Sequence, residues 1–121
     1  MKVMNVFLIT FLFFALTISC KKTEYVKMKP QLKIIVNDAS NKPVANASVD
    51  LYKSMADFQN HTSPIVSSTT DANGLVLFSD LEEINYYFFV EANEKSNYFG
   101  ISATSKPLET GVILSITTNI N

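Results

Sequence analysis

The pattern of hydrophobic and polar residues changes at Gln31, where short alternating runs begin. In the first run, Leu32, Ile34 and Val36 fall on one face of an extended chain. Turn-forming residues such as Asn, Asp, Gly and Pro separate this run from the later ones. The pattern predicts seven strands, at about 32–36, 47–51, 65–70, 75–78, 86–92, 98–103 and 112–118. Seven short strands with turns at this spacing indicate an all-β, immunoglobulin-like sandwich.

Two segments between the predicted strands have a local signal of their own. Ser54 stands three residues before Asp57, which is the pattern of a helix start, so we expect one short helical turn within 53–64. Residues 71–74 (DANG) predict a β-hairpin turn in which Gly74 takes a positive φ.

Alternation also assigns faces to the aromatic strands. We expect the core side to hold Val76, Phe78, Tyr86, Phe88 and Val90. The opposite side then receives Leu75, Leu77, Tyr87 and Phe89. Because a solvated sheet face should be polar, these four residues form a candidate partner-binding patch. The alternative, which we favour, is that the 53–64 segment covers them with Met55 and Phe58.

The N-terminal part of the chain has the features of an export signal. Lys2 precedes an apolar run at 3–18, which is too short to cross a bilayer as a helix, and Ser19-Cys20 follows it. Thr17-Ile18-Ser19-Cys20 resembles the bacterial lipoprotein box, in one of the relaxed forms of the motif that are common in the Bacteroidetes. The resemblance implies that 1–19 is removed and that Cys20 carries a diacylglycerol, whose two acyl chains suffice for stable anchoring.

An exported lipoprotein would divide into three parts: a signal peptide (1–19), a lipidated N-terminus and tether (20–30), and a β-sandwich domain (31–121). The expected location is the outer membrane, with the periplasmic and surface faces both left open. A plain signal peptide, with Cys20 near the cleavage site by chance, is the alternative.

Composition excludes several functions. The chain has ten basic and eleven acidic side chains, lacks Arg and has no basic cluster beyond Lys21-Lys22, so we expect no nucleic-acid partner. His61 is the only histidine, no nucleophile motif is present and the carboxylates are scattered, so we expect no enzyme and no cofactor. Asp71 and Glu82 have the spacing of the first and last ligands of a calcium loop, but the predicted strand between them should separate them, so we expect no metal site.

Three segments carry a family resemblance. Residues 41–52 (NKPVANASVDLY) are similar to a G-x-P-V-x-G-A-x-V-x-L signature, and 70–81 (TDANGLVLFSDL) to T-D-x-N-G-x-x-x-F-x-x-L. The strand at 86–92 follows in the right order. These features resemble carboxypeptidase regulatory-like and Cna-B-type domains over about 31–118, which implies a seven-stranded prealbumin-like sandwich. Asn41 and Asn46 replace two of the family's glycines, a change that a left-handed turn tolerates.

Some Cna-B-type domains contain an internal Lys–Asn isopeptide bond promoted by an acid, which the resemblance places at Glu91. Val36 occupies the lysine position, and only a slipped register would bring Lys33 towards Asn119 or Asn121. We therefore expect no such bond. The resulting expectation is a non-catalytic binding module for another envelope protein or for an extracellular ligand such as a glycan. The alternative is a structural spacer or assembly subunit without a ligand of its own.

Overall fold

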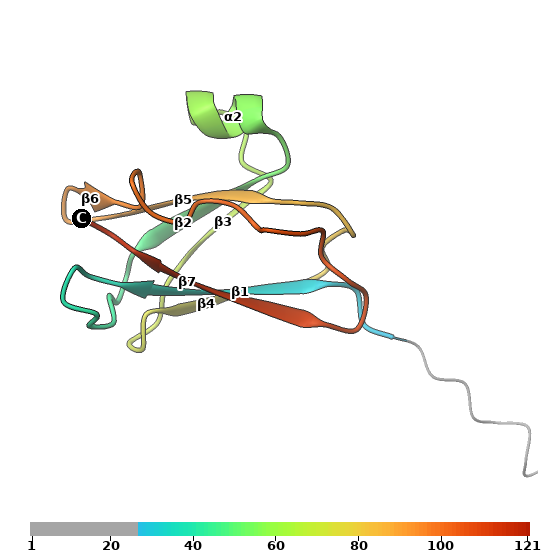
Figure 1. Cartoon of the computed structure of the whole chain (residues 1–121), viewed down its shortest axis with the longest axis horizontal. Coiled ribbons are helices and arrows are strands. Elements are labelled where there is room, and N and C mark those ends of the chain that lie inside the picture. Colours follow the sequence, from blue (N-terminus) through green and yellow to red (C-terminus); the bar gives the residue numbers. More distant parts are fainter. Residues whose placement is uncertain (1–26) are drawn as a thin grey trace, which may run out of the picture.

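The computed structural model describes residues 27–121 (Figure 1). The predicted signal peptide and Cys20 lie outside these residues. Seven strands and one short helix follow in the order β1 (Gln31–Asn37), β2 (Ser48–Tyr52), α2 (Met55–Asn60), β3 (Val66–Thr69), β4 (Leu75–Phe78), β5 (Tyr87–Ala92), β6 (Lys95–Ser96) and β7 (Ile113–Asn119). Within residues 27–121, no helix has the length and apolar character needed to span a membrane.

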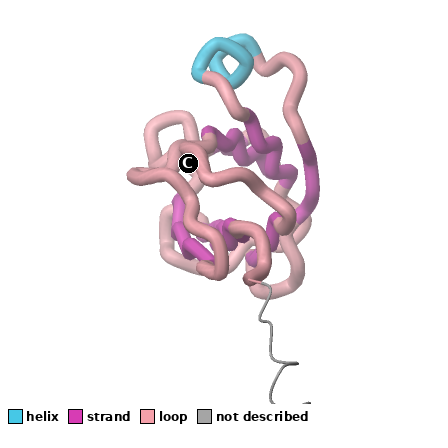
Figure 2. The backbone as a smooth tube through the Cα atoms, turned by 90° about the vertical axis from the view of Figure 1, so that its right-hand side faces the viewer, coloured by secondary structure: helices cyan, strands magenta, loops and turns pink. Residues whose placement is uncertain are grey.

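The strands form two sheets that face each other, with orders β4-β1-β7 and β3-β2-β5-β6. Strands β1 and β7 run parallel, with Gln31 beside Ile113 and Asn37 beside Asn119, whereas the other pairs are antiparallel. Figure 2 shows the two layers nearly end-on, with α2 outside the layer that contains β2 and β5. The prediction of an all-β sandwich of seven strands is confirmed.

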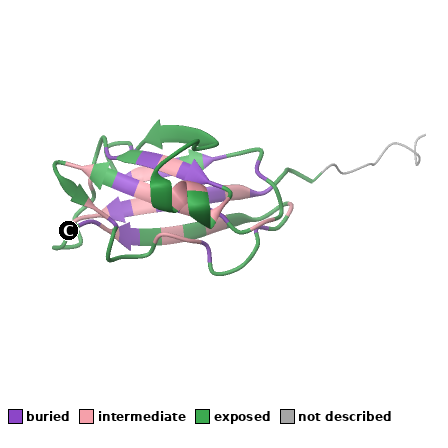
Figure 3. Ribbon diagram, turned by 90° about the horizontal axis from the view of Figure 1, so that it is seen from above, coloured by how far each residue is buried: buried purple, intermediate pink, exposed green. Residues whose placement is uncertain are grey.

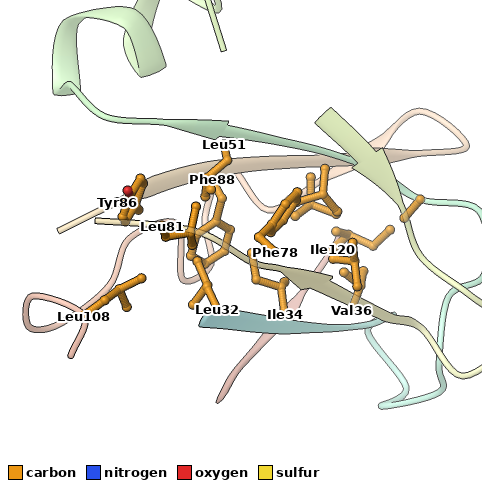
Figure 4. Close-up of a cluster of buried hydrophobic side chains, with 14 residues drawn as sticks. Leu32, Ile34, Val36, Leu51, Phe78, Leu81, Tyr86, Phe88, Leu108 and Ile120 are labelled. Atoms are coloured by element: carbon orange, nitrogen blue, oxygen red, sulfur yellow. The ribbon is translucent and has the colours of Figure 1, made fainter. Parts of the chain in front are cut away.

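The hydrophobic core fills the space between the sheets, and buried positions alternate with more exposed ones along β1 and β5 (Figure 3). Leu32, Ile34 and Val36 point inward from β1, as predicted, towards the side chains of the other sheet (Figure 4). All five residues that alternation assigned to the core are buried: Val76, Phe78, Tyr86, Phe88 and Val90. The period of two along each strand was therefore sufficient to predict the inner faces.

The turn residues behave as their chemistry requires. Gly74 has φ +73°, and the carboxylate of Asp71 accepts hydrogen bonds from the backbone N–H groups of Asn73 (2.9 Å) and Leu75 (3.0 Å). Asn41 (φ 61°) and Asn46 (φ 58°) are both left-handed, which explains why glycine is common at these family positions.

Two sequence predictions about the strands are wrong. Residues 71–74 do not close a hairpin, because β3 pairs with β2 in one sheet and β4 pairs with β1 in the other. The turn is a corner between the sheets. The strand predicted at 98–103 is also absent: the sixth strand is Lys95–Ser96, and the following residues form a loop. Only the end of that segment approaches β5, where the carbonyl of Ser102 accepts a hydrogen bond from Phe88 N–H (2.8 Å).

Candidate functional site

The structure does not bring the four residues of the predicted patch together. Leu75 and Leu77 lie on β4, whereas Tyr87 and Phe89 lie on β5, and these strands belong to different sheets. Since all four point away from the core, the two pairs occupy opposite outer faces of the sandwich. The prediction of one continuous patch is therefore wrong, because alternation along single strands cannot tell which sheet each strand joins.

The short helix α2 covers the pair on β5. Measured between ring centroids, Phe58 lies 6.0 Å from Tyr87, and His61, which caps the end of the helix, lies 4.4 Å from Phe89. The helix begins as predicted, because the Ser54 hydroxyl accepts a hydrogen bond from Asp57 N–H (3.1 Å). The favoured alternative, coverage by the 53–64 segment, is thus confirmed for Tyr87 and Phe89. It does not extend to Leu77, which is 47% exposed.

The most exposed aromatic residues of the described chain lie elsewhere, in the loop that follows β6. Phe99 is 90% exposed and Tyr98 is 73% exposed, and Ile101 is exposed beside them. The two rings stack edge to face, with centroids 4.9 Å apart and planes at 86°. We call residues 98–101 the aromatic tip. The tip differs from the strand predicted here, because aromatic and β-branched residues in this segment favour a strand.

A buried side chain fixes the base of the aromatic tip. Asn97 is 0% exposed, and its oxygen accepts a hydrogen bond from Val90 N–H (2.9 Å). Its Nδ2 donates to the carbonyls of Phe88 and Ile101, both at 3.1 Å. Both polar atoms of the Asn97 side chain are therefore bonded to the backbone, and two of the three bonds attach the loop to β5, at Val90 and Phe88.

Strand β7 holds the other side of the loop. The Thr118 hydroxyl donates to the Ile101 carbonyl (2.7 Å), and Gly100 N–H donates to the Asn97 carbonyl (2.9 Å). Gly100 lies so close to β7 that a Cβ there would be 3.0 Å from the Asn119 carbonyl oxygen. The tip is consequently a fixed structure that presents two aromatic rings to solvent.

The two carboxylates with the spacing of a calcium loop, Asp71 and Glu82, make separate contacts at the surface. Lys53 and Glu82 form an exposed ion pair (2.9 Å), and the hydrogen bond to Glu82 raises the pKa of Lys53. Glu82 therefore points to Lys53, while the Asp71 carboxylate is engaged by its own turn. Within residues 27–121, no group of three or more His, Cys, Asp and Glu side chains is placed to hold a metal ion.

The residues considered for an isopeptide bond are also apart. Lys33 lies on the outer face of β1, beside Leu77 and Ser115, whereas Glu91 is exposed on the outer face of the other sheet. The side-chain amide of Asn119 donates to the Asp38 carbonyl and to Asn41 Oδ1, both at 2.9 Å. The amide is thus already engaged at the end of the sandwich.

The two-sheet arrangement, with a parallel β1–β7 pair and a fixed loop at one end, defines an all-β sandwich of the prealbumin-like class. The family model for the SpaA prealbumin-like fold domain matches residues 30–115, which is most of the chain, and the chain belongs to this family. A comparison with curated protein sequences found no significant match.

Solved structures share the same fold. The chain is similar to the Bacillus anthracis TIE protein, with a TM-score of 0.53 and 20% identity over 74% of this chain and 16% of that one. It is also similar to the group B streptococcus pilus 2b backbone protein, with a TM-score of 0.51 and 15% identity over 77% of this chain and 41% of that one. The chain spans less than half the length of either structure, and the likeness shows the fold alone.

Proposed function

We propose that this protein is a lipid-anchored, non-catalytic binding module of a bacterial outer membrane and that the aromatic tip is its binding surface. The observation that carries the proposal is the exposure of Phe99 and Tyr98 on a loop fixed by the buried Asn97. Exposed apolar surface is costly in water and commonly marks an interaction site. Rigid aromatic side chains lose little conformational entropy when they bind, which makes them effective anchors.

The chemistry of the tip favours a protein partner over a glycan. Aromatic residues are enriched at protein–protein interfaces. Sugar recognition also needs polar groups that converge on the ligand. However, the polar groups of Asn97 at the base of the tip, and the Ile101 carbonyl in it, are already used in bonds within the domain. We infer that the partner offers an apolar concave surface for the two rings.

The direction of the chain is consistent with an anchored module. The first described residue, Lys27, lies near the start of β1, whereas the tip packs against the end of the parallel strand β7. A tether at 21–30 spans at most about 35 Å, so an anchor at Cys20 would leave the tip accessible away from the attachment point.

The anchor is tested by replacing Cys20. Cys20→Ser should move the protein from the detergent phase to the aqueous phase in phase partitioning, because the thiol is the proposed attachment site of the lipid. Unchanged partitioning of the variant, or an aqueous wild type, would exclude the anchor.

The binding surface is tested by photo-crosslinking in the native envelope. A photo-reactive amino acid at position 99 should give protein adducts. The same group at position 115, which is exposed on β7 away from the tip, should not. Adducts at 115 without adducts at 99 would show that the tip is not the binding surface.

The alternative function, an assembly subunit, has one observation in its favour. The outer face of the β4-β1-β7 sheet is uncovered and carries exposed Leu77 and Ile113 on strands at its two edges. If this face rather than the tip were buried in an assembly, crosslinks would concentrate at position 77.

A further inference from the structure

A second apolar feature lies at the end of the sandwich opposite to the aromatic tip. It is a hollow of about 320 Å³ that opens on the surface beside the starts of β1 and β7. The residues that line it are Lys27, Met28, Lys29, Gln31, Gly111, Val112 and Ile113. We call it the terminal hollow. Its apolar members are exposed to solvent, and Ile113 is 52% exposed.

Backbone hydrogen bonds fix the walls of the terminal hollow. Gly111 N–H donates to the Met28 carbonyl (2.7 Å), and Gln31 N–H donates to the Val112 carbonyl (3.3 Å). The segment before β1 is thereby attached to the segment before β7. The hollow, like the tip, is a feature of the folded domain.

The size of the hollow suits an aromatic ring. An apolar cavity of about 150 Å³ is enough to bind benzene. The terminal hollow is about twice as large, so it can take the Phe99 ring together with part of the Tyr98 ring that stacks on it. Residues 96–101 carry no charge, so the tip itself would bring no ionised group into the hollow, whose own charged residues are Lys27 and Lys29.

The two features cannot meet within one molecule. The hollow adjoins Ile113 at the start of β7, and the tip contacts Thr118 and Asn119 at the end of the same strand. Seven residues of β-strand separate them, which is about 20 Å. A tip can therefore fill only the hollow of another molecule.

We propose that the aromatic tip of one copy inserts into the terminal hollow of a second copy, so that the protein associates head to tail. This inference rests on the proposed function, because it names the partner of the same tip. A contact between two different surfaces of one protein closes into a ring where the rotation between copies permits, and otherwise continues into an open row. Burial of a single phenyl side chain is a small gain against the cost of association, so the association should be weak and concentration-dependent.

The test uses residues 21–121, which lack Cys20 and contain every residue of the core cluster. Sedimentation velocity should show an average mass that rises with concentration. Phe99→Ser should weaken self-association by at least about tenfold, which corresponds to loss of the buried ring. Ile113→Glu should do the same by replacing an apolar wall of the hollow with a charged side chain. Met55→Ser is the matched control, since Met55 on α2 has a similar exposure (47%) and lies outside both surfaces, and it should associate like the wild type.

Mixing the two variants gives the decisive result. Phe99→Ser keeps an intact hollow, and Ile113→Glu keeps an intact tip. An equimolar mixture should therefore form one-to-one dimers that neither variant forms alone, and it should not form longer rows. Circular dichroism and denaturation of each variant confirm that it is folded.

Three outcomes would overturn the inference. They are a wild type that stays monomeric to millimolar concentration, self-association that neither substitution weakens, and a mixture of variants that forms no dimer. In each case, protein adducts from position 99 to a different protein would still support the proposed function, so the two proposals can fail separately.

Discussion

The side-chain oxygen of Asn97 accepts a hydrogen bond from the backbone N–H of Val90 at 2.9 Å, in the interior of the domain. The Asn97 amide also donates to the Phe88 and Ile101 carbonyls. One side chain therefore supplies hydrogen-bond partners both to the backbone of β5 and to the backbone of the aromatic tip. A buried polar group of this kind is stabilising only while all its partners are satisfied.

Asn97→Ala should destabilise the fold by about 1–3 kcal/mol, since Val90 N–H and the Phe88 carbonyl lose their partner in a buried site, whereas the Ile101 carbonyl keeps its bond from Thr118. It should also increase hydrogen exchange at residues 98–101. Asn73→Ala is the control, because Asn73 is exposed in the 71–74 turn. Chemical denaturation of both variants gives the comparison, and equal losses would contradict a special role for Asn97.

Phe78→Ala should cost about 3–5 kcal/mol, the usual range for removing an aromatic side chain from a core. Phe78 is 4% exposed and lies opposite Leu32, between the sheets. Phe89→Ala should cost clearly less, because Phe89 lies on the outer face and is covered only in part by His61. Denaturant titration of the two variants measures the difference in the free energy of unfolding. A larger loss of stability for Phe89→Ala would show that the inner and outer faces are assigned the wrong way round.

The parts of the fold that depend on short-range pattern could be predicted from the sequence, and those that depend on pairing could not. The inner residues of β1 and β5 follow from alternation, and Ser54 and Gly74 follow from local cap and turn chemistry. The sheet that β4 joins depends instead on contacts with β1, which lies about forty residues earlier in the sequence. This is why Leu77 and Phe89 were expected on one face and lie on two.

The aromatic tip was missed for a related reason. Residues 98–103 contain Tyr, Phe and Ile, which favour a strand in isolation. The loop is determined by Asn97, whose three partners lie on β5 and at Ile101. No local signal distinguishes an asparagine that will be buried from an exposed one. Only Gly100, within an otherwise strand-like run, indicated an interruption or a close approach of two backbones.

The soluble domain should retain its full mass, without the loss of ammonia that an internal isopeptide bond would cause. The physical reason is distance, since Lys33 and Glu91 lie on opposite outer faces and the Asn119 amide is bonded to Asp38 and Asn41. Intact-mass spectrometry of residues 21–121 measures this directly. A mass lower by one ammonia would show that the register around Lys33 is wrong.

Acid should weaken the turn at 38–42. The carboxylate of Asp38 accepts hydrogen bonds from the backbone N–H groups of Lys42 (3.0 Å) and Ser40 (2.8 Å). These bonds, of which the one from Lys42 has the larger effect, hold the pKa of Asp38 below its ordinary value of 3.8. Since the folded pKa is the lower one, the ionised carboxylate stabilises the fold above the unfolded pKa, and this contribution is lost as the pH falls through the folded pKa. Asp38→Asn should therefore be less stable than the wild type at neutral pH, and the difference should shrink below about pH 4. A difference that is constant with pH would exclude this role for the carboxylate.

Two glycines with similar backbone angles should respond very differently to alanine. Gly74 (φ +73°) and Gly111 (φ +78°) are both left-handed, so alanine at either site should cost about 1–2 kcal/mol for the backbone alone. At Gly74, however, a Cβ would lie 2.5 Å from the Val36 carbonyl oxygen, an atom that also accepts a hydrogen bond from Val44 N–H. At Gly111 it would meet only the Lys27 side chain, at 3.6 Å. The structure cannot relieve the first contact without moving β1, so Gly74→Ala should reduce the free energy of unfolding by about 1–3 kcal/mol more than Gly111→Ala.

Chemical denaturation of both variants, with the slopes compared to verify two-state unfolding, measures this difference. Equal losses would mean that the 71–74 corner can move away from β1, and that its close packing is not what fixes the path between the two sheets.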